Sequence, residues 1–319
     1  MDKRSIVSLC RHDDITRNYF HEYAESMGIN VDFCPLVSRT EKDVVEAAKG
    51  YSAIIASVEP YTREVFKALS PELKAVHRFG VGYDNIDVEA ARDFDIAVMI
   101  ASGGNAAAVA DHAIMLMLAL GRRIHLYDRA TRRGEWIQRP YSQLSGKKVG
   151  LIGFGRIGRI LCGLLSGFRC DILVNDAYIS DDVFEEYGIR RAEMNEIASE
   201  CDFVSLHVPL TEETRGLIGM NFLKQMKSSA FLINTSRGPI VREADLVLAL
   251  REGLIAGAGL DVFEKEPIDA DNPLKEMDNV ILSPHIAFST LEANRLTSEI
   301  IINNLQSFFD GRPCRDVVN

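Results

Sequence analysis

The sequence predicts an α/β protein with two doubly wound domains, each a parallel β-sheet covered by helices on both faces. Short apolar runs alternate with amphipathic stretches along the chain, a rhythm typical of parallel strands joined by helices. The rhythm breaks after residue 100 and starts again near residue 147, so there are two such series. The length of 319 residues fits two domains of roughly 150 residues each.

The first series contains the expected strands of the first domain. Their apolar runs cover residues 5–10, 31–34, 53–57, 73–79 and 95–99, and helical patterns lie between them, the first over residues 14–27. The second run has sharp limits because Gly28 precedes it and Pro35 follows it.

The stretch between the two series has a different residue pattern, with no alternation of short apolar runs and helices. Residues 106–120 form a long apolar pattern, which predicts one buried helix with Asn105 as its N-cap and Gly121 as its C-terminal stop. Residues 122–148 then hold eight Lys or Arg and two acidic residues, a local charge of 8 − 2 = +6. This segment, which contains the sole tryptophan, Trp136, is either an anion or nucleic-acid surface or a solvated or subunit-facing arm. The net acidity of the chain favours the arm.

The second series starts at residue 147. Its apolar runs cover residues 147–155, 171–176, 202–209, 230–236, 255–262 and 279–286. Helices are expected between these runs, including residues 177–200, and an amphipathic helix from about residue 290 to 310. The first domain boundary is expected near residues 102–105. A return of the last helix to the first domain would place a second crossing near residues 287–290.

Composition narrows the class of protein. The formal charge is 36 − 46 = −10, which argues against nucleic acid or an anionic membrane as the main partner. The longest apolar run, residues 113–120, is far shorter than the roughly 20 residues that span a bilayer, and the N-terminal apolar stretch is too short for a secretory signal. Six scattered cysteines without a CxxC pair predict reduced thiols of a cytoplasmic protein, and no Cys/His cluster predicts a metal site.

A glycine-rich turn carries the first functional signal. Gly153, Gly155 and Gly158 form GFGRIG directly after the apolar run KVGLI and before a helical pattern. A dinucleotide site needs one glycine for the tight turn, one for close approach of the pyrophosphate and one for helix–strand packing. The N-terminus of the helix then offers free N–H groups to the phosphates.

An acidic residue at the end of the next strand supports the same interpretation. Asp176 ends the run DILVND, 23 positions after Gly153, where a carboxylate accepts hydrogen bonds from the adenosine ribose. Its charge would repel a 2′-phosphate, and no Arg follows within DAYIS, so the sequence predicts NAD rather than NADP. The alternative is an ordinary turn residue at a strand end.

Three further residues fall at strand ends of the second series. Arg237 follows a strand in LINTSRGPI and could hold a carboxylate bidentately, although a lone arginine is more often a surface ion pair. Glu266 lies in DVFEKEP, and His285 follows Pro284 after NVILS. A carboxylate beside an imidazole stabilises the protonated ring, so this pair predicts a general acid/base.

Together these motifs resemble the D-isomer-specific 2-hydroxyacid dehydrogenases. The resemblance runs through RFGVGYDNID, SGGNAAAVADHA, GLIGFGRIGR, LHVPLTEETRGLIG, FLINTSRGPIV, AGLDVFEKEP and SPHIA, in the order of the family. The glycerate, phosphoglycerate and glyoxylate/hydroxypyruvate branches look most similar. RFGVGYDNID and DAYISD also resemble the C-terminal binding protein corepressors, which share the fold.

The resemblance implies a role for each matching residue. His285 would act as proton donor and acceptor, Glu266 would support its imidazolium, and Arg237 would hold the substrate. The backbone at Val81 and Gly82 would bind the substrate carboxylate. The remaining positions are implied to contact the cofactor: Arg156 and Ile157 with the three glycines, Asp176, His207, Pro209, Thr214, Thr235, Asp261 and Ala287, together with His285.

The resemblance also implies a split first domain. We therefore expect a smaller, flavodoxin-like substrate domain of residues 1–102 and 289–319, and a Rossmann NAD-binding domain of residues 103–288. It further implies that the arm packs across a homodimer. Because the chain ends at Asn319, we expect no appended regulatory domain.

The predicted function is hydride transfer between NAD(H) and a small 2-keto or D-2-hydroxy acid, of glyoxylate, hydroxypyruvate or phosphoglycerate type. The alternative is an NAD-binding regulator of the corepressor kind with little turnover. The formate branch carries Gln where Glu266 stands, and the lactate branch tends to have Tyr near Ser289, so both are disfavoured. Arg78, near the carboxylate loop, could bind a substrate phosphate or form a structural ion pair.

Overall fold

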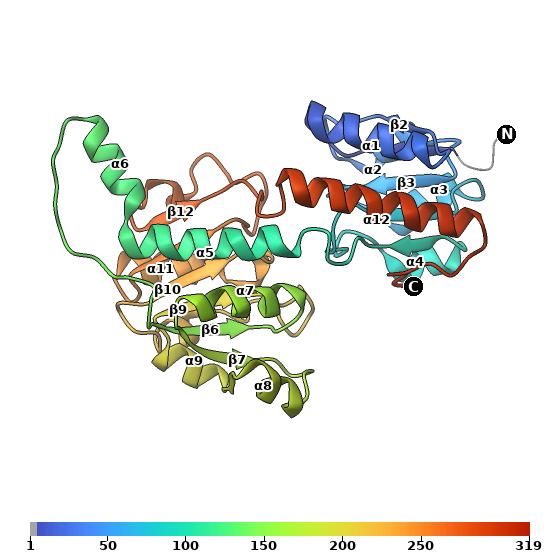
Figure 1. Ribbon diagram of the computed structural model, residues 1–319. Helices are drawn as coiled ribbons and strands as arrows, with labels where there is room; N and C mark the ends of the chain where they lie inside the picture. The colour runs from blue at the N-terminus through green and yellow to red at the C-terminus, as the bar shows by residue number, and fades with distance from the viewer. Residues whose placement is uncertain (1–4) are drawn as a thin grey trace. The chain divides into compact units, whose positions relative to one another are not determined.

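The computed structural model describes residues 5–319 and divides the chain into two compact units. The first unit contains the chain up to Asn105 together with Ser289–Asn319, and the second contains Ala106–Phe288 (Figure 1). Residues 1–4, part of the N-terminal stretch considered above as a secretory signal, lie outside the described residues.

The first unit contains a parallel sheet in the order β2-β1-β3-β4-β5, which is the flavodoxin-like order. Its strands are β1 (Ile6–Ser8), β2 (Val31–Phe33), β3 (Ala53–Ala56), β4 (Ala75–Arg78) and β5 (Ala97–Met99). Its helices are α1 (Asp14–Ser26), α2 (Glu41–Ala48), α3 (Arg63–Leu69), α4 (Val88–Asp93) and α12 (Leu291–Phe309).

Helices cover both faces of this sheet. Phe20 of α1 and Ile301 of α12 share one buried cluster, and Val44 of α2 shares another with Phe66 of α3. The last helix therefore packs beside α1 and completes the layer on that face, although about 280 residues separate the two in sequence, as in the hydrogen bond from Asn294 to Thr16.

The second unit contains a seven-stranded parallel sheet in the order β12-β11-β10-β9-β6-β7-β8. Chain order runs outward from β6 in both directions, which is the Rossmann arrangement. The strands are β6 (Lys148–Ile152), β7 (Asp171–Asn175), β8 (Arg190–Arg191), β9 (Phe203–Leu206), β10 (Phe231–Asn234), β11 (Gly257–Leu260) and β12 (Val280–Leu282). The helices are α5 (Ala106–Arg122), α6 (Ile124–Arg132), α7 (Arg156–Gly167), α8 (Asp181–Tyr187), α9 (Met194–Glu200), α10 (Met220–Leu223), α11 (Glu243–Arg251), and the 3₁₀ turns η1 (Gly238–Ile240) and η2 (Pro273–Glu276).

The parallel sheets confirm the predicted fold class, and three local expectations are corrected. The helix α5 passes through Gly121 and ends at Arg122, since the left-handed residue that stops it is Arg123, with φ of 50°. Gly121 is buried, and a Cβ atom added to it would lie 3.4 Å from Cζ of Phe203. Asn105 is no N-cap, because its side-chain oxygen is buried and accepts no hydrogen bond from the described residues. The short strand β8 falls in a stretch expected to be helical.

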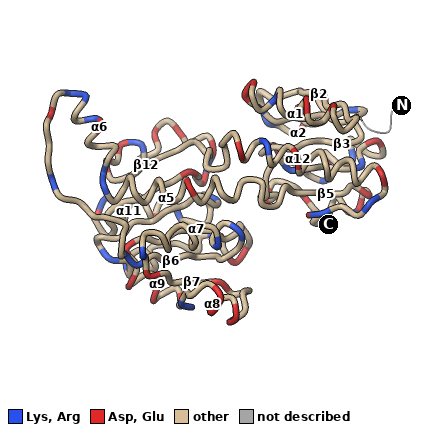
Figure 2. The backbone as a smooth tube through the Cα atoms, in the orientation of Figure 1, with Lys and Arg blue, Asp and Glu red and all other residues tan. Residues whose placement is uncertain are grey.

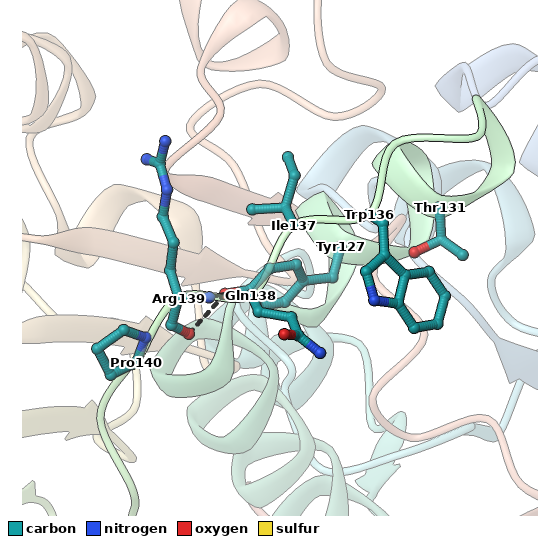
Figure 3. A pocket seen from close by; sticks show the side chains of 7 residues that line it. All are labelled: Tyr127, Thr131, Trp136, Ile137, Gln138, Arg139 and Pro140. Atoms are coloured by element: carbon teal, nitrogen blue, oxygen red, sulfur yellow. Dashed lines mark hydrogen bonds between the residues drawn. The ribbon is translucent and has the colours of Figure 1, made fainter.

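The basic segment after α5 forms α6 and a long loop that extends from the second unit, with Lys and Arg positions along it (Figures 1 and 2). The helix is anchored to the turn before β12, where Arg129 forms an ion pair with Asp278 at 2.5 Å and His125 contacts the carbonyl oxygen of Asp278. Trp136 is 82% exposed. Figure 3 shows a hollow at the loop, where the Tyr127 hydroxyl donates to the carbonyl oxygen of Arg139 at 2.7 Å.

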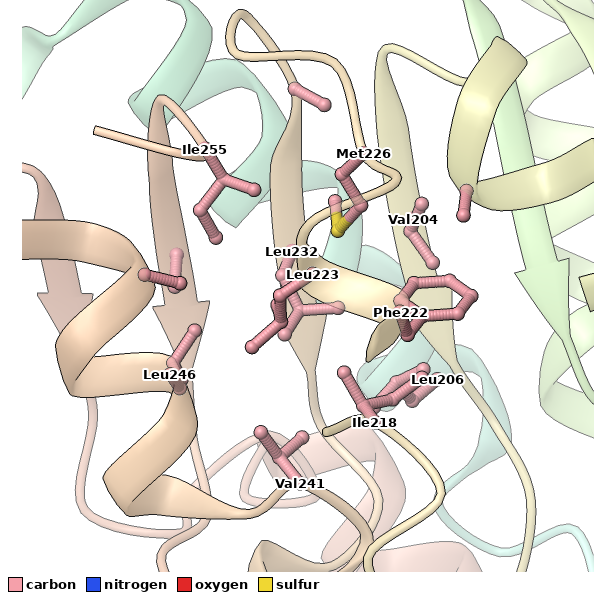
Figure 4. Close-up of a cluster of buried hydrophobic side chains, with 14 of the residues drawn as sticks. Val204, Leu206, Ile218, Phe222, Leu223, Met226, Leu232, Val241, Leu246 and Ile255 are labelled. Atoms are coloured by element: carbon pink, nitrogen blue, oxygen red, sulfur yellow. The ribbon is translucent and has the colours of Figure 1, made fainter. Parts of the chain in front are cut away.

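Two apolar cores sandwich the second sheet, because successive strand residues point to opposite faces. Phe231 and Ile233 of β10 face α5 and α7, whereas Leu232 between them faces α9, α10 and α11. Figure 4 shows this second core, in which Leu232 packs with Phe222 of α10 and Leu246 of α11. Such a sheet places its helices on both faces and leaves its carboxyl edge open for ligands.

Within residues 5–319, no helix combines the length and apolar character needed to cross a membrane. The same residues hold no group of three or more His, Cys, Asp or Glu side chains placed to bind a metal ion.

Candidate active site

Three predicted residues follow three adjacent strands of the second sheet. Arg237 follows β10, Glu266 lies in the loop after β11, and His285 lies three residues after β12. Because these strands are parallel neighbours, their carboxyl ends meet at one edge of the sheet.

Glu266 and His285 are in direct contact. The Nδ1 atom of His285 lies 2.7 Å from Oε2 of Glu266, and the backbone N–H of Phe263 donates to Oε1 at 3.0 Å. A carboxylate only accepts, so Nδ1 carries the hydrogen and Nε2 is the ring nitrogen left for proton exchange. Burial raises the pKa of Glu266, but its hydrogen bonds from His285 and Phe263 and the charge of Arg237 together hold it below the ordinary value of 4.5. Glu266 is therefore an anion at neutral pH.

A glycine brings the arginine turn to the glutamate loop. A Cβ atom on Gly238 would lie 1.9 Å from the backbone carbon and oxygen of Phe263, so only glycine permits this approach. Arg237 precedes this glycine, and Phe263 binds Glu266. The close contact of the two backbones places a guanidinium and a carboxylate at the same edge of the sheet.

The side chain of Asn234 holds the arginine turn. Asn234 is buried at the end of β10, and its Oδ1 accepts from the backbone N–H and the hydroxyl of Ser236, each at 3.0 Å. Its Nδ2 donates to the carbonyl oxygen of Arg237 at 2.9 Å. Arg237 itself donates from Nη1 to the carbonyl oxygen of Ser236 at 2.7 Å. This local network fixes the backbone position from which the Arg237 side chain extends.

The three glycines of the turn after β6 each meet a different steric demand. Gly153 has a left-handed φ of 98°, and a Cβ there would lie 2.6 Å from the backbone of His207. A Cβ on Gly158 would lie 2.6 Å from the carbonyl oxygen of Gly153, so α7 packs closely on the turn. A Cβ on Gly155 would meet nothing within 4 Å. The protein itself therefore does not require glycine at 155, whereas a pyrophosphate above this turn would.

The start of α7 and the end of β7 also fit a dinucleotide. Gly155 caps α7 without a side-chain hydrogen bond, and Arg156 and Ile157 open the helix. Free N–H groups at such a helix start bind phosphate oxygens. The carboxylate of Asp176 accepts from the backbone N–H groups of Phe154 at 2.7 Å and Tyr178 at 2.8 Å. Each oxygen can accept a further bond, so lone pairs remain for ribose hydroxyls.

Unpartnered polar atoms mark two further predicted positions. The Nδ1 atom of His207 and the hydroxyl of Thr235 are buried and have no hydrogen-bond partner among residues 5–319. Such atoms are rare in folded proteins and suit a ligand that supplies the missing bond. Burial lowers the pKa of His207 to about 4, so its ring is neutral at pH 7. Two other predicted residues contact each other: the Thr214 hydroxyl donates to the carbonyl oxygen of Pro209 at 2.6 Å.

Asp261 holds the loop that carries His285. Its side chain is fully buried, and the backbone N–H groups of Ile286 and Ala287 donate to its carboxylate at 2.9 and 2.8 Å. The N–H of His285 donates to its carbonyl oxygen at 2.8 Å. These bonds are the contacts that the structure shows, and the expected contact of Asp261 with the nicotinamide carboxamide stays a prediction.

The predicted carboxylate loop lies in the first unit, after β4. Arg78 donates to the carbonyl oxygen of Gly82 from Nε at 3.0 Å and to that of Phe79 from Nη1 at 2.7 Å. The arginine thus closes the loop around Val81. Its guanidinium acts on the backbone of its own loop.

Sequence reasoning missed four residues that shape these sites: His112, Ser283, Asn234 and Arg191. His112 was detectable as a polar residue in the apolar pattern of α5, and Asn234 as a polar residue in a buried strand. Arg191 of β8 reaches the end of β7, where its guanidinium lies 3.4 Å from the carbonyl oxygen of Asp176 and forms an ion pair with Asp181 at 2.9 Å. It was missed because β8 was expected to be helical.

Comparison with known proteins identifies the second unit. Residues 114–287 match the family model described as the NAD-binding domain of D-isomer-specific 2-hydroxyacid dehydrogenases. The chain is 40% identical over 287 residues to a glyoxylate reductase of Korarchaeum cryptofilum, covering 88% of this chain and 86% of that protein. It is 37% identical over 300 residues to a D-3-phosphoglycerate dehydrogenase of Archaeoglobus fulgidus, covering 93% of this chain but only 56% of that protein.

A solved structure extends the likeness to the whole chain. The apo-structure of D-lactate dehydrogenase from Escherichia coli matches with a TM-score of 0.86 and 30% identity, over 98% of this chain and 99% of that one. These matches confirm the predicted oxidoreductase class and the NAD cofactor, and they favour the dehydrogenase over the corepressor alternative. The chain belongs to the family of D-isomer-specific 2-hydroxyacid dehydrogenases.

Proposed function

We propose that this chain reduces small, unphosphorylated 2-keto acids of the glyoxylate and hydroxypyruvate type with NADH, and oxidises the corresponding D-2-hydroxy acids in reverse. The contact between His285 and Glu266 at 2.7 Å, on the same sheet edge as Arg237, carries the proposal. NADH supplies the hydride that adds to the carbonyl carbon of the substrate. The second unit would hold this cofactor.

His285 would supply the proton. As negative charge grows on the carbonyl oxygen, the Nε2–H of the imidazolium donates to it, and the neutral ring takes the proton back in the oxidative direction. The Glu266 carboxylate favours the charged ring through the Nδ1 hydrogen bond. The guanidinium of Arg237 suits a planar carboxylate and its neighbouring carbonyl, which it can bind with two parallel hydrogen bonds.

The loop around Val81 and Gly82 would bind the substrate carboxylate through backbone N–H groups. The contacts of Arg78 support an unphosphorylated substrate, since its guanidinium donates to the carbonyl oxygens of Gly82 and Phe79. These bonds give the guanidinium a structural role in its own loop. The glyoxylate reductase relative, with 86% of its length covered, supports the same substrate class.

The cofactor residues would divide into two groups. Gly153, Gly155 and Gly158 with Arg156 and Ile157 would bind the pyrophosphate, and Asp176 the adenosine ribose. The remaining positions would line the adenosine and nicotinamide sides: His207, Pro209, Thr214, Thr235, Asp261 and Ala287.

Steady-state reduction with NADH tests the substrate class. Glyoxylate and hydroxypyruvate should give the highest kcat/KM, followed by pyruvate, with phosphohydroxypyruvate lowest. An Arg237→Gln variant provides the matched background, because it removes the cation and keeps a shorter, uncharged polar side chain. Preference for phosphohydroxypyruvate would overturn the substrate class, and no turnover with any keto acid would overturn the activity.

The arm supports a homodimer of cytoplasmic enzyme. Trp136 is 82% exposed, and Ile137 and Tyr141 are each 41% exposed, so the loop after α6 presents an apolar surface. All six cysteines are unpaired, which suits a reducing compartment. Sedimentation should show twice the 35.5 kDa chain mass, and Trp136→Glu should shift it toward the monomer. A monomeric parent at micromolar concentration would contradict the dimer.

A further inference from the structure

One face of α5 packs on β11, the strand that ends directly before Asp261. A Cβ on Gly259 would lie 3.0 Å from Cβ of Leu116 and 3.1 Å from Cδ1 of Leu120, so this face packs on β11. One helical turn before Leu116 stands His112, and two residues beyond Gly259 stands Asp261. Residues four apart on a helix and two apart on a strand share a face, so the two periods bring a histidine over a buried carboxylate.

A serine joins the two side chains. Nε2 of His112 lies 2.9 Å from the hydroxyl of Ser283, and that hydroxyl donates to Oδ1 of Asp261 at 2.6 Å. The His112 side chain is 13% exposed and Asp261 is fully buried. The single hydroxyl proton of Ser283 is directed at the carboxylate, so the hydroxyl must accept from His112, whose Nε2 therefore carries a hydrogen. The chain of bonds runs in one direction, from His112 through Ser283 to Asp261.

At its other end this chain of bonds reaches the backbone directly after His285. Asp261 accepts the N–H groups of three successive residues, His285 through its carbonyl and Ile286 and Ala287 through its carboxylate. His285 has a left-handed φ of 56°, a conformation that non-glycine residues adopt only when their surroundings hold them. The orientation of the imidazole thus depends on the position of Asp261.

We propose that His112 is a positioning residue for the reaction: through Ser283 it orients the Asp261 carboxylate, which binds the N–H groups of Ile286 and Ala287 and so fixes the chain directly after the strained residue His285. This rests on the proposed function, because it assigns His285 the proton transfer. His112 touches no reacting atom. Its contribution lies in the hydrogen bond that fixes the Ser283 hydroxyl, and a network of this kind loses rigidity when its terminal donor is removed.

The test compares variants of the full-length protein. His112→Leu removes the donor at similar volume, and His112→Gln keeps a donor at similar reach. Ser283→Ala breaks the same chain of bonds from the other side and serves if His112→Leu does not fold. Leu116→Ala is the matched control, since it weakens packing one turn away on the same helix face and leaves the hydrogen bonds intact. Reduction of glyoxylate is measured with NADH and with NADH deuterated at the transferred position.

We expect His112→Leu and Ser283→Ala each to lower kcat about three- to tenfold, with a larger deuterium isotope effect and little change in the KM for NADH. His112→Gln should retain most of the activity. The double variant should be no slower than the slower single variant, because both act on one chain of bonds. Leu116→Ala should lower the thermal midpoint and leave kcat and the isotope effect unchanged.

A spectroscopic measurement separates this proposal from the proposed function. The imidazole NMR signals of His285, assigned by their loss in His285→Ala, should shift in His112→Leu and stay in place in Leu116→Ala. Unchanged His285 signals, additive effects of the two single variants, or an equal loss of kcat in Leu116→Ala would overturn the positioning role. Absence of turnover in the parent protein would instead overturn the proposed function, and the NMR comparison would still decide the positioning role.

Discussion

Replacing Glu266 by glutamine isolates the effect of one charge on the proton donor. The substitution keeps the shape of the side chain and removes the negative charge next to the His285 ring, whose Nδ1 lies 2.7 Å from Oε2. Glu266 is ionised throughout the neutral range, since its hydrogen bonds and the Arg237 charge outweigh burial and lower its pKa. The change therefore acts at every pH at which the enzyme would be assayed.

The size of the effect follows from distance and exposure. At a charge separation of about 4 Å, the attraction is worth about 1 kcal/mol in water and about 4 kcal/mol at an effective dielectric constant of about 20. The His285 and Glu266 side chains are 28% and 33% exposed, so solvent screening brings the value toward the lower figure. Loss of the Glu266 charge should therefore make the charged His285 ring less favourable by about 1 kcal/mol, which moves the pH dependence of the reaction toward lower pH.

The assay is the pH dependence of kcat for the reduction of a 2-keto acid by NADH. Reduction needs the imidazolium, so activity should decline on the alkaline side, and in Glu266→Gln this decline should start at lower pH. Oxidation of the hydroxy acid needs the neutral ring, so its rise with pH should move in the same direction. The glutamine has one carbonyl oxygen for two donors, Phe263 and His285, so some loss of kcat is expected at every pH.

Glu264→Gln is the matched control for this experiment. Glu264 lies on the same loop, and its carboxylate accepts from the backbone N–H of Glu243 at 3.1 Å. Its neutralisation should leave the pH profile in place. A Glu266→Gln profile that overlays that of the parent, or one that moves to higher pH, would refute the assignment of Glu266 as the group that stabilises the charged ring.

Three more expectations follow from the same residues. His285→Ala should lower kcat by about a hundredfold or more with NADH binding retained, and near-full activity would exclude it as the acid/base. Asp176→Ser should shift the ratio of kcat/KM for NADH over NADPH toward NADPH by at least about tenfold, because the Arg191 guanidinium already lies near the Asp176 carbonyl; an unchanged ratio would contradict this. Burial lowers the pKa of His77 from 6.5 to about 4, so the unfolded chain binds more protons between these values and stability falls as pH drops through them, by up to roughly 3 kcal/mol. His77→Gln should flatten this dependence in urea unfolding at neutral and acidic pH, and an equally steep dependence in the variant would rule His77 out.

Local patterns explain why much of the fold was predictable. The apolar runs of β9, β10 and β11 are buried on both faces, and such continuous runs separate strands from helices without any tertiary information. Helix ends were less predictable, because a glycine can either stop a helix or lie within it. Gly121 was expected to stop α5, but it lies inside the helix, and Arg123 adopts the left-handed conformation instead.

The individual residues of the candidate site were predictable from the sequence, but some of their spatial neighbours were not. Strand-end positions and residue chemistry indicated Arg237, Glu266 and His285, and the glycine spacing indicated the turn after β6. Nothing in a local pattern indicated that the end of β8 would place Arg191 beside the strand that ends before Asp176, because a two-residue strand leaves almost no periodic signal.

The sequence by itself determined the alternation of strands and helices, the glycine turn and the acidic residue that follows it, because these depend on neighbours within one or two elements. The tertiary structure alone decided which strand ends meet. The order β10, β11, β12 sets Arg237, Glu266 and His285 on one edge, Gly238 allows two distant loops to touch, and α5 lays His112 over Asp261. These contacts join residues about 20 to 170 positions apart, as for His112 and Ser283, and such pairings follow from how whole elements pack.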